Sequence, residues 1–292
     1  MTKTRYVPFS PDEQLIQRFI AAALLEDAGS GDHTSVSTIP ETAHERARLL
    51  VKDTGVLAGA ELALYIFRQV DPALAVKKFI TDGTYIQPGD IVLEAEGPAR
   101  SILLAERLVL NCMQRMSGIA TLTDRMVRKL DGLHTQLLDT RKTTPGFRYF
   151  EKWAVLTGGG GNHRFGLYDM ILIKDNHVDY AGGIAQAIGR AKNYLAEKKL
   201  ALDIEIEVRN FKELDEALAA GGIQRIMLDN FSIPDLLEAV KKIGGRYKTE
   251  ASGGIGEQNL RAYAETGVDY ISMGALTHSY RSLDLSLKAE RK

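Results

Sequence analysis

The second half of the chain alternates short apolar runs with amphipathic segments. Each of six apolar runs leads into a charged residue, a hydroxyl or a glycine, and these residues are Asp139, Lys174, Glu207, Asp229, Ser252 and Gly274. The last four are 22, 23 and 22 residues apart, with helical spacing between them over 211–220, 234–243 and 257–266. Regular strand–helix units of this length are typical of a parallel α/β barrel. The pattern predicts six barrel strands, or seven if one is irregular.

The first 115 residues follow a mixed pattern. Ser10, Pro11 and Glu13 form a helix start, with Ser10 as the cap, Pro11 at the first position and Glu13 closing a capping box. The other predicted elements are strands over 46–58 and 75–95, a helix near 60–70, and two helices between 101 and 130 that break at Gly118. This half is therefore expected to be a separate α+β unit.

Composition narrows the class of protein. Lys and Arg total 37 against 38 Asp and Glu, so the chain has no basic field of the kind that general nucleic-acid binding needs. The single Cys112 excludes a disulfide framework and a multi-cysteine metal site. The longest apolar run, 19–25, is too short to span a bilayer, and the first ten residues lack the apolar stretch of a secretory signal. We expect a cytoplasmic protein with no membrane or nucleic-acid partner.

Candidate chemistry gathers at the ends of the predicted barrel strands, where parallel barrels form their active sites. Five side chains there are cationic or can become so: Arg141, Lys142, His163, Arg164 and Lys174. Arg suits planar carboxylates and Lys suits phosphate, so this set predicts one or two ligands that carry several negative charges. Two carboxylates, Glu207 and Asp229, are too few for an all-protein metal cage but fit Mg²⁺ shared with substrate phosphates.

Each of these residues also has a plain structural interpretation. A single Lys or Arg after a strand is usually a solvated loop charge, and the carboxylates could serve only structural ion pairs. The segment 252–254 could be an ordinary turn, although glycine-rich backbone that enters a helix also cradles phosphate. The glycine run 158–161 belongs to neither dinucleotide-binding nor P-loop motifs. The joint occurrence at successive strand ends favours function.

The motifs, taken in order, resemble the quinolinate phosphoribosyltransferase family, also called carboxylating nicotinate-nucleotide pyrophosphorylases. They begin with Asp-Thr-Arg-Lys-Thr-Thr-Pro-Gly at 139–146 and Gly-Gly-Gly-Asn-His-Arg-Phe-Gly-Leu-Tyr-Asp at 159–169. The remaining motifs are 173–177, 204–208, 227–231, 250–255 and 274–279, preceded by 26–35 and by Glu106-Arg107. The resemblance covers nearly the whole chain.

The resemblance implies a two-domain subunit. Residues 1–115 would form an N-terminal α/β sandwich, completed by 278–292, and 116–277 an open parallel α/β barrel of six or seven strands. It also implies a homodimer, or a larger homo-oligomer, in which one subunit's N-terminal domain covers the barrel mouth of the other. The implied reaction joins quinolinate to 5-phosphoribosyl-1-diphosphate and gives nicotinate mononucleotide, diphosphate and CO₂ in NAD biosynthesis.

The resemblance also implies roles for individual residues. Those that would contact quinolinate are Arg107, Arg141, His163, Arg164 and Lys174. Those that would face the phosphoribosyl diphosphate and Mg²⁺ are Lys142, Glu207, Asp229, Ser252, Gly253, Gly254, Gly274 and Ala275, and Thr140 and Met273 complete the substrate-binding set. Lys142, Lys174, Glu207 and Asp229 would act in catalysis, with Glu207 and Asp229 as metal ligands. Arg107 would reach the partner's site from the edge of a buried stripe formed by Leu104, Leu108 and Cys112.

Two other functions are compatible with parts of this pattern. A paralogue in the same family is associated with molybdenum transport, but the motifs at 140–146 and 162–164 favour the quinolinate enzyme. The second is a catalytically silent barrel that senses a pyridine carboxylate or a nucleotide. Such a sensor would need only the cations that bind the ligand, so the presence of Glu207 and Asp229 as well argues against it. Release of CO₂ or diphosphate discriminates the enzyme from both.

Overall fold

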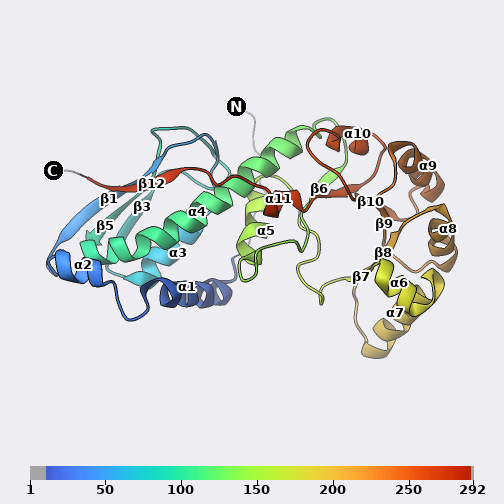
Figure 1. Cartoon of the computed structure of the whole chain (residues 1–292), viewed down its shortest axis with the longest axis horizontal. Coiled ribbons are helices and arrows are strands. Elements are labelled where there is room, and N and C mark those ends of the chain that lie inside the picture. Colours follow the sequence, from blue (N-terminus) through green and yellow to red (C-terminus); the bar gives the residue numbers. More distant parts are fainter. Residues whose placement is uncertain (1–10, 291–292) are drawn as a thin grey trace. The chain divides into compact units, whose positions relative to one another are not determined.

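The computed structural model describes residues 11–290, which form two compact units (Figure 1). The first unit contains the described residues up to 124, together with 144–159 and those from 276 onward. The second contains 125–143 and 160–275. Residues 144–159 thus belong to the first unit, whereas the sequence places them in the barrel domain. The division also falls later than residue 115, because helix α4 (Ala99–Arg128) continues through that position.

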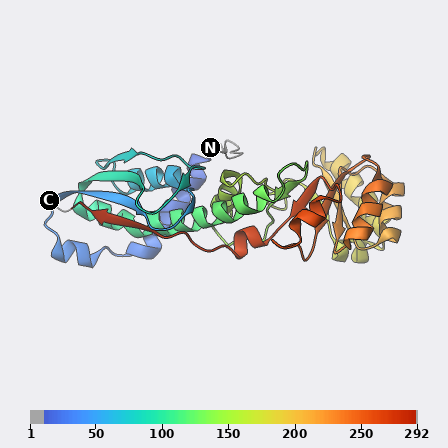
Figure 2. The same ribbon diagram turned by 90° about the horizontal axis from the view of Figure 1, so that it is seen from above.

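The first unit is built on a four-stranded antiparallel sheet in the order β12-β1-β5-β3. Its strands are β1 (His44–Val51), β3 (Ala75–Lys78), β5 (Ile91–Pro98) and β12 (Leu285–Ala289). Alternate residues of β1, such as Leu49 and Val51, are fully buried, as expected for a sheet with one covered face. The C-terminal strand β12 pairs along β1 and completes the sheet, and the two lie side by side in Figure 2. A separate pair joins β2 (Gly55–Val56) to β4 (Tyr85–Ile86).

The first unit also contains helices. They are α1 (Glu13–Ala28), α2 (His33–Thr38), α3 (Ala60–Val70), α4 and α5 (Arg148–Thr157), and the short α11 (Ala275–His278) begins at the end of the second unit. The start of α1 differs from the sequence prediction: Asp12 is the N-cap and its Oδ1 accepts from Leu15 N at 3.0 Å. Pro11 therefore precedes the helix, and the predicted cap Ser10 lies outside the described residues.

The prediction of a helix break at Gly118 is wrong. Helix α4 runs unbroken over thirty residues. A Cβ atom at Gly118 would overlap the backbone carbonyl of Arg281, so the glycine is required for close approach of another segment rather than for a turn. The buried stripe of α4 also differs from the predicted one, because it follows Ala105, Val109 and Met113, while Leu104 and Leu108 are only half-buried.

The second unit is an open barrel of six parallel strands in the order β6-β11-β10-β9-β8-β7, which confirms the predicted architecture. The strands are β6 (Gln136–Leu138), β7 (Ile171–Ile173), β8 (Ile204–Val208), β9 (Arg225–Asp229), β10 (Lys248–Ser252) and β11 (Tyr270–Ser272). Within the described chain no pairing joins β6 to β7, so the barrel is not closed. Gly161 makes a single parallel bridge to Leu138, which is as near as the chain comes to a seventh strand.

Helices lie on the outer side of these strands in Figure 1. They are α6 (Asp175–Ala181), α7 (Ile184–Lys198), α8 (Phe211–Ala220), α9 (Ile233–Ile243) and α10 (Leu260–Ala264). Helix α8 has the predicted bounds, whereas α10 is shorter than the predicted 257–266 because the chain turns at Gly256, whose N–H donates to Asn259 Oδ1 at 2.7 Å. Among residues 11–290, no helix combines the length and the apolar character needed to cross a membrane.

Candidate active site

A pocket of about 300 Å³ lies at the carboxyl ends of the barrel strands, inside the second unit. Its lining residues are Thr140, Arg141, Lys142, His163, Arg164, Leu172, Lys174, Met227, Ser252 and Ser272. All five predicted cationic groups of the barrel therefore meet in one place. The sequence does not single out Leu172, Met227 or Ser272, although strand alternation places such residues inside a barrel.

Two arginines in this pocket repel each other. Arg141 follows β6, and its buried Nε has no hydrogen-bond partner among the described residues. Arg164 is half-buried and its Nη1 donates to the backbone carbonyl of Met170 at 3.2 Å. Burial, and then the charge of Arg141, lowers the pKa of the Arg164 guanidinium. A site that holds like charges together at this depth favours an anionic ligand, and the fork of Arg fits a carboxylate.

Lys142 and Thr140 shape the turn after β6. The Lys142 N–H donates to Thr140 Oγ1 at 3.0 Å, and the Lys142 residue is exposed. Asp139, just before this turn, is fully buried and its Oδ1 accepts from His163 N at 2.9 Å. The carboxylate of Asp139 thereby fixes the turn to the glycine-rich segment that carries His163.

Lys174 ends β7 and stands at the N-terminus of α6. Its Nζ donates to Glu207 Oε2 at 3.0 Å, so the predicted cation and the predicted carboxylate form an ion pair. His177 closes the helix start, because its Nδ1 accepts from Lys174 N at 2.9 Å. This capping bond is the role that the structure gives to His177.

The backbone after β9 and β10 forms the glycine-rich part of the site. Gly253 and Gly254 have φ values of +91° and +61°, and a Cβ on Gly253 would overlap the Asn230 side chain. Asn230 itself has φ +56°, and its Nδ2 donates to Asp229 Oδ2 at 2.6 Å. Successive residues with positive φ turn their N–H groups outward, as in an anion cradle. Asp229 is thus oriented at the edge of this cradle by its neighbour Asn230.

The remaining predicted residues lie at strand ends without lining the 300 Å³ pocket. They are Glu207, Asp229, Gly253, Gly254, Met273, Gly274 and Ala275. Met273 is buried, and its N–H donates to the Leu138 carbonyl at 2.9 Å, which holds the end of β11 against β6.

A layer of charged side chains beneath the pocket was not predicted from the sequence. His163 Nε2 lies 3.1 Å from Glu205 Oε2 and 3.4 Å from Glu250 Oε2. Arg225 Nη1 donates to Glu250 Oε2 at 2.9 Å. The alternation of side chains along a strand could have predicted this layer. Glu205 lies two residues before Glu207, and Glu250 lies two residues before Ser252, so each glutamate points to the same face of its strand as the predicted site residue.

The pKa values in this layer indicate a tightly held proton. Burial opposes a charge on His163, but the bonds to Glu205 and Glu250 outweigh it and raise the pKa of His163 to about 9. Burial, and then the charge of Glu250, raises the pKa of Glu205 to about 7. The Arg164 N–H is aimed at His163 Nδ1 at 2.7 Å, so the neutral form of the ring carries its proton on Nε2, facing the two carboxylates.

Among the described residues, His163, Glu205 and Glu250 are the group whose ligand atoms lie close enough together to hold a metal ion, within 4.8 Å of one another. Arg225 already contacts both carboxylates, at 2.9 Å from Glu250 and 3.8 Å from Glu205. A divalent ion would meet this fixed positive charge. We therefore interpret the layer as a network of buried charges, in which both oxygens of Glu205 lack a hydrogen bond to the described residues.

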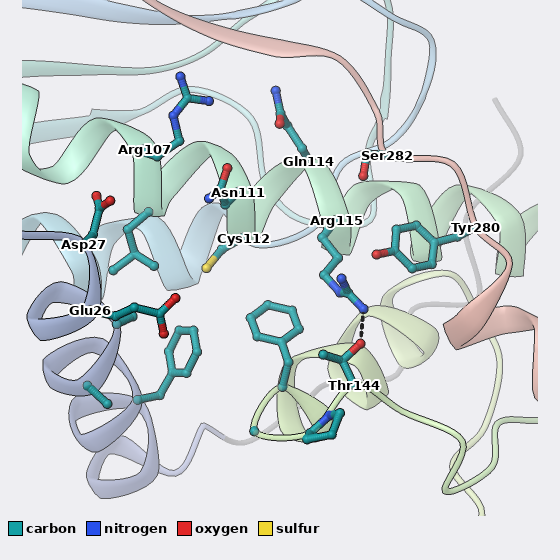
Figure 3. Close-up of a pocket in the computed structure, with 17 residues that line it drawn as sticks. Glu26, Asp27, Arg107, Asn111, Cys112, Gln114, Arg115, Thr144, Tyr280 and Ser282 are labelled. Carbon is teal, nitrogen blue, oxygen red and sulfur yellow. Dashed lines mark hydrogen bonds between the residues drawn. The ribbon is translucent and has the colours of Figure 1, made fainter.

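Arg107 lies in a different pocket, of about 680 Å³, inside the first unit (Figure 3). Arg107, Asn111 and Arg115 are spaced four residues apart on α4 and so lie along one face of that helix. Glu26 and Asp27 of α1 also line this pocket. Arg107 is exposed, as expected for a side chain that is available to a ligand or a partner.

Arg115 anchors the far side of the same pocket. Its Nε donates to Glu151 Oε1 at 3.0 Å, and Glu151 is fully buried. Its guanidinium also lies 5.5 Å from the Phe147 ring and 5.0 Å from the Tyr280 ring, and it donates to Thr144 Oγ1. These contacts explain why 144–159 belongs to the first unit.

Comparison with known proteins gives a consistent result. Residues 32–117 match the model of the quinolinate phosphoribosyl transferase N-terminal domain and residues 119–288 match that of its C-terminal domain. The chain is 47% identical to a rice chloroplastic nicotinate-nucleotide pyrophosphorylase [carboxylating] over 94% of this chain and 78% of the relative. It is 43% identical to the probable enzyme of that name from Bacillus subtilis, over 93% and 92% of the two chains. The crystal structure of NadC from Streptococcus pyogenes superposes with a TM-score of 0.90 at 37% identity, covering 97% of this chain and all of that one.

Proposed function

Because the chain belongs to the quinolinate phosphoribosyltransferase family, we propose that its barrel pocket transfers a phosphoribosyl group from 5-phosphoribosyl-1-diphosphate to quinolinate. The products are nicotinate mononucleotide, diphosphate and CO₂, as a step of NAD biosynthesis. The observation that carries the proposal is the convergence of Arg141, Lys142, Arg164 and Lys174 on one pocket. Two anionic substrates, a dicarboxylate and a phosphorylated sugar, supply the charge that these four cations need.

We assign the arginines and the lysines of the pocket to different groups of the two substrates. Arg141 and Arg164 suit the carboxylates of quinolinate, and the unpartnered buried Nε of Arg141 supports this assignment. Lys142 and the backbone of 252–254 suit the phosphates. Lys174 contacts Glu207 and also lines the pocket, and we assign it as the third cation that binds quinolinate.

The transfer step needs no covalent nucleophile from the protein. The pyridine nitrogen of quinolinate attacks the anomeric carbon while the bond from that carbon to the diphosphate oxygen breaks. Lys142 and the cradle at 252–254 stabilise the negative charge that develops on the leaving diphosphate. Glu207 and Asp229 hold the ribose hydroxyls and so orient the carbon under attack.

Decarboxylation follows from the charge that the transfer creates. The nitrogen, now cationic, withdraws electrons, so the bond between C2 and its carboxylate can break and leave an electron pair at C2 that takes up a proton. An arginine fork on the C2 carboxylate would stabilise the reactant and slow this loss. We therefore assign the fork to the C3 carboxylate and a weaker contact to the C2 carboxylate.

We propose that Mg²⁺ accompanies the phosphoribosyl diphosphate. Glu207 and Asp229 end the neighbouring strands β8 and β9, and their carboxylate oxygens are the hard donors that Mg²⁺ takes in small number beside substrate phosphates. They fit such an ion better than a closed protein cage, because Glu207 is also paired with Lys174. When bound, the ion neutralises charge on the leaving diphosphate.

We propose that two copies of the chain share their active sites, with Arg107 of one copy gripping a quinolinate carboxylate in the barrel of the other. The exposed position of Arg107 on the pocket face of α4, and the incomplete burial of Leu104 and Leu108 there, support a face that another chain covers. A homodimer is the simplest assembly of this kind. Cytoplasmic location stays a prediction, since the rice relative is chloroplastic.

The test of the activity is direct. The purified protein is mixed with quinolinate, 5-phosphoribosyl-1-diphosphate and Mg²⁺, and CO₂, diphosphate and nicotinate mononucleotide are measured. We expect the three products in equal amounts. A protein that binds quinolinate and releases none of them is a sensor, and the proposal is then abandoned.

A further inference from the structure

The two carboxylates of the charged layer beneath the barrel pocket are completely buried. Glu205 and Glu250 have no exposed surface, and Arg225 lies with its guanidinium 4.2 Å from the ring of Tyr270. Two buried carboxylates are costly unless both receive partners. Arg225 supplies a full charge to Glu250, and the Nε2–H of His163 faces both glutamates. Neither oxygen of Glu205 has a hydrogen bond among the described residues, so the imidazole at 3.1 Å is a closer charge partner for this carboxylate than Arg225 at 3.8 Å.

The same imidazole reaches the pocket through its other nitrogen. His163 Nδ1 accepts from the backbone N–H of Arg164 at 2.7 Å, and His163 N donates to Asp139 Oδ1 at 2.9 Å. Both ring nitrogens are thus engaged with protein groups. Rotation of the ring would break the bond to Arg164 together with the contacts to Glu205 and Glu250. The orientation of the buried glutamates is thereby transmitted to the residue that carries a pocket guanidinium.

We propose that Glu205 and Glu250 are positioning residues that fix Arg164 for the carboxylate of quinolinate, acting through the imidazole of His163. The inference rests on the proposed function. Arg164 stands beside Arg141, and two like charges push each other out of any single orientation. A bidentate grip requires the guanidinium to be held in one geometry before the substrate arrives. The buried layer supplies this constraint by fixing the His163 ring, which in turn holds the backbone of Arg164.

The experiment compares steady-state kinetics of the wild-type enzyme with Glu250→Gln and Glu205→Gln. Each change keeps the shape of the side chain but removes the charge that holds the imidazole. We expect the KM for quinolinate to rise about 10- to 100-fold, because each change removes a buried charge that faces the imidazole. The KM for 5-phosphoribosyl-1-diphosphate should change less than about twofold, since its phosphates are assigned to the Lys142 side chain and to backbone N–H groups of 252–254, which the substitutions leave in place.

Asp269→Asn is the matched control. Asp269 accepts from Thr249 N at 2.9 Å and pairs with Lys248 Nζ at 2.8 Å, so it anchors the same strand, β10, at the opposite end. It should lower stability without separating the two KM values. A double variant, His163→Gln with Glu250→Gln, tests the route: if Glu250 acts through His163, the double variant is no worse in quinolinate KM than His163→Gln alone.

Two results would overturn the inference. One is a folded Glu250→Gln enzyme whose two KM values rise equally or not at all, and the other is full additivity in the double variant. If Glu250→Gln does not fold, Glu250→Asp keeps the charge with a shorter reach, and the same separation of KM values is required of it. Failure of the proposed function looks different, because the wild-type protein would then form no nicotinate mononucleotide.

Discussion

The Nζ of Lys174 lies 3.0 Å from Glu207 Oε2, and this contact joins the ends of two adjacent parallel strands, β7 and β8. The carboxylate side chain is nearly buried, with 7% exposed, whereas the lysine side chain is 47% exposed. The buried carboxylate of Glu207 therefore holds the more exposed ammonium of Lys174 at the pocket. The pair unites a group assigned to quinolinate with one assigned to the ribose or the metal.

Lys174→Ala should impair substrate binding more than stability. A half-exposed ion pair contributes less than about 1 kcal/mol to the free energy of unfolding. A charge-assisted contact to a substrate carboxylate is worth more, so we expect the KM for quinolinate to rise about 10- to 100-fold. Lys248→Ala is the control, because it removes an exposed pair to Asp269 at the other end of the barrel. Kinetics and thermal melting of both variants check this.

Nicotinate should not replace quinolinate. It lacks the C2 carboxylate, so cations arranged around two carboxylates would be left partly unpaired in the pocket. Sites built to bind a polar group reject the analogue that lacks it by about 10⁴-fold or more. Parallel assays of diphosphate release with the two pyridines measure the ratio of kcat/KM. Comparable values would contradict a pocket that also contacts the C2 carboxylate.

Removal of divalent cations should abolish turnover. Excess EDTA is expected to stop diphosphate release, and added Mg²⁺ should restore it. Asp229→Asn should raise the KM for 5-phosphoribosyl-1-diphosphate more than that for quinolinate, because its carboxylate is assigned to the metal and the ribose. Unchanged activity in EDTA would rule out the magnesium requirement.

Arg107 should act in the partner's site. Arg107→Ala and Lys142→Ala are each expected to be nearly inactive, with the fold retained because both side chains are exposed. When the two inactive proteins exchange subunits, each mixed dimer would hold one site with both defects and one intact, so about half of its sites should work. The test measures the activity of the mixture, and mass spectrometry of the intact dimers shows whether the subunits have exchanged.

The control for this experiment is Arg68→Ala, since Arg68 is also an exposed arginine on a helix of the first unit and should have no effect. Subunit exchange without recovered activity would mean that Arg107 serves its own chain or no site at all.

The pH dependence of stability should reveal Asp82. Its Oδ1 accepts from Ala60 N at 2.8 Å, and burial raises its pKa from 3.8 to about 6. A carboxyl with a raised pKa favours folding below its unfolded pKa and loses that contribution as pH rises through the folded value. The difference in unfolding free energy between the wild type and Asp82→Asn should therefore change by about 3 kcal/mol between about pH 4 and 6.

Denaturant titrations across that range measure this difference. Asp71→Asn provides the contrast, because the hydrogen bond from Ser101 lowers the pKa of Asp71, so its contribution should be lost as pH falls. A difference between wild type and Asp82→Asn that does not vary with pH would show that the Asp82 carboxyl is not shielded from water.

The amino-acid sequence by itself determined the barrel and the rim of its pocket. Apolar runs with a fixed spacing define parallel strands, and a charged or small residue after each run lies at the same edge of the barrel because parallel strands share one direction. That local rule is sufficient to bring Arg141, Lys174 and Ser252 together. It requires no knowledge of which strand neighbours which.

Tertiary structure decided the features that depend on particular neighbours. Gly118 reads as a helix breaker, yet it lies inside α4 because the backbone of Arg281, more than 160 residues later, packs against it. In the same way, the ion pair between Glu151 and Arg115 of α4 packs residues 144–159 against the first unit. Close approach between distant segments leaves no periodic trace in either segment.

The buried layer lies between these two cases. Alternation places Glu205 and Glu250 on the inner face of their strands, but a charged residue at such a position reads equally well as part of an exposed rim. Only the register of β8, β9 and β10 brings the two carboxylates to Arg225 and to His163, which arrives from a separate loop. Whether a charge is buried and partnered is decided by the side chains of other strands, because its solvation and its electrostatic energy depend on everything around it.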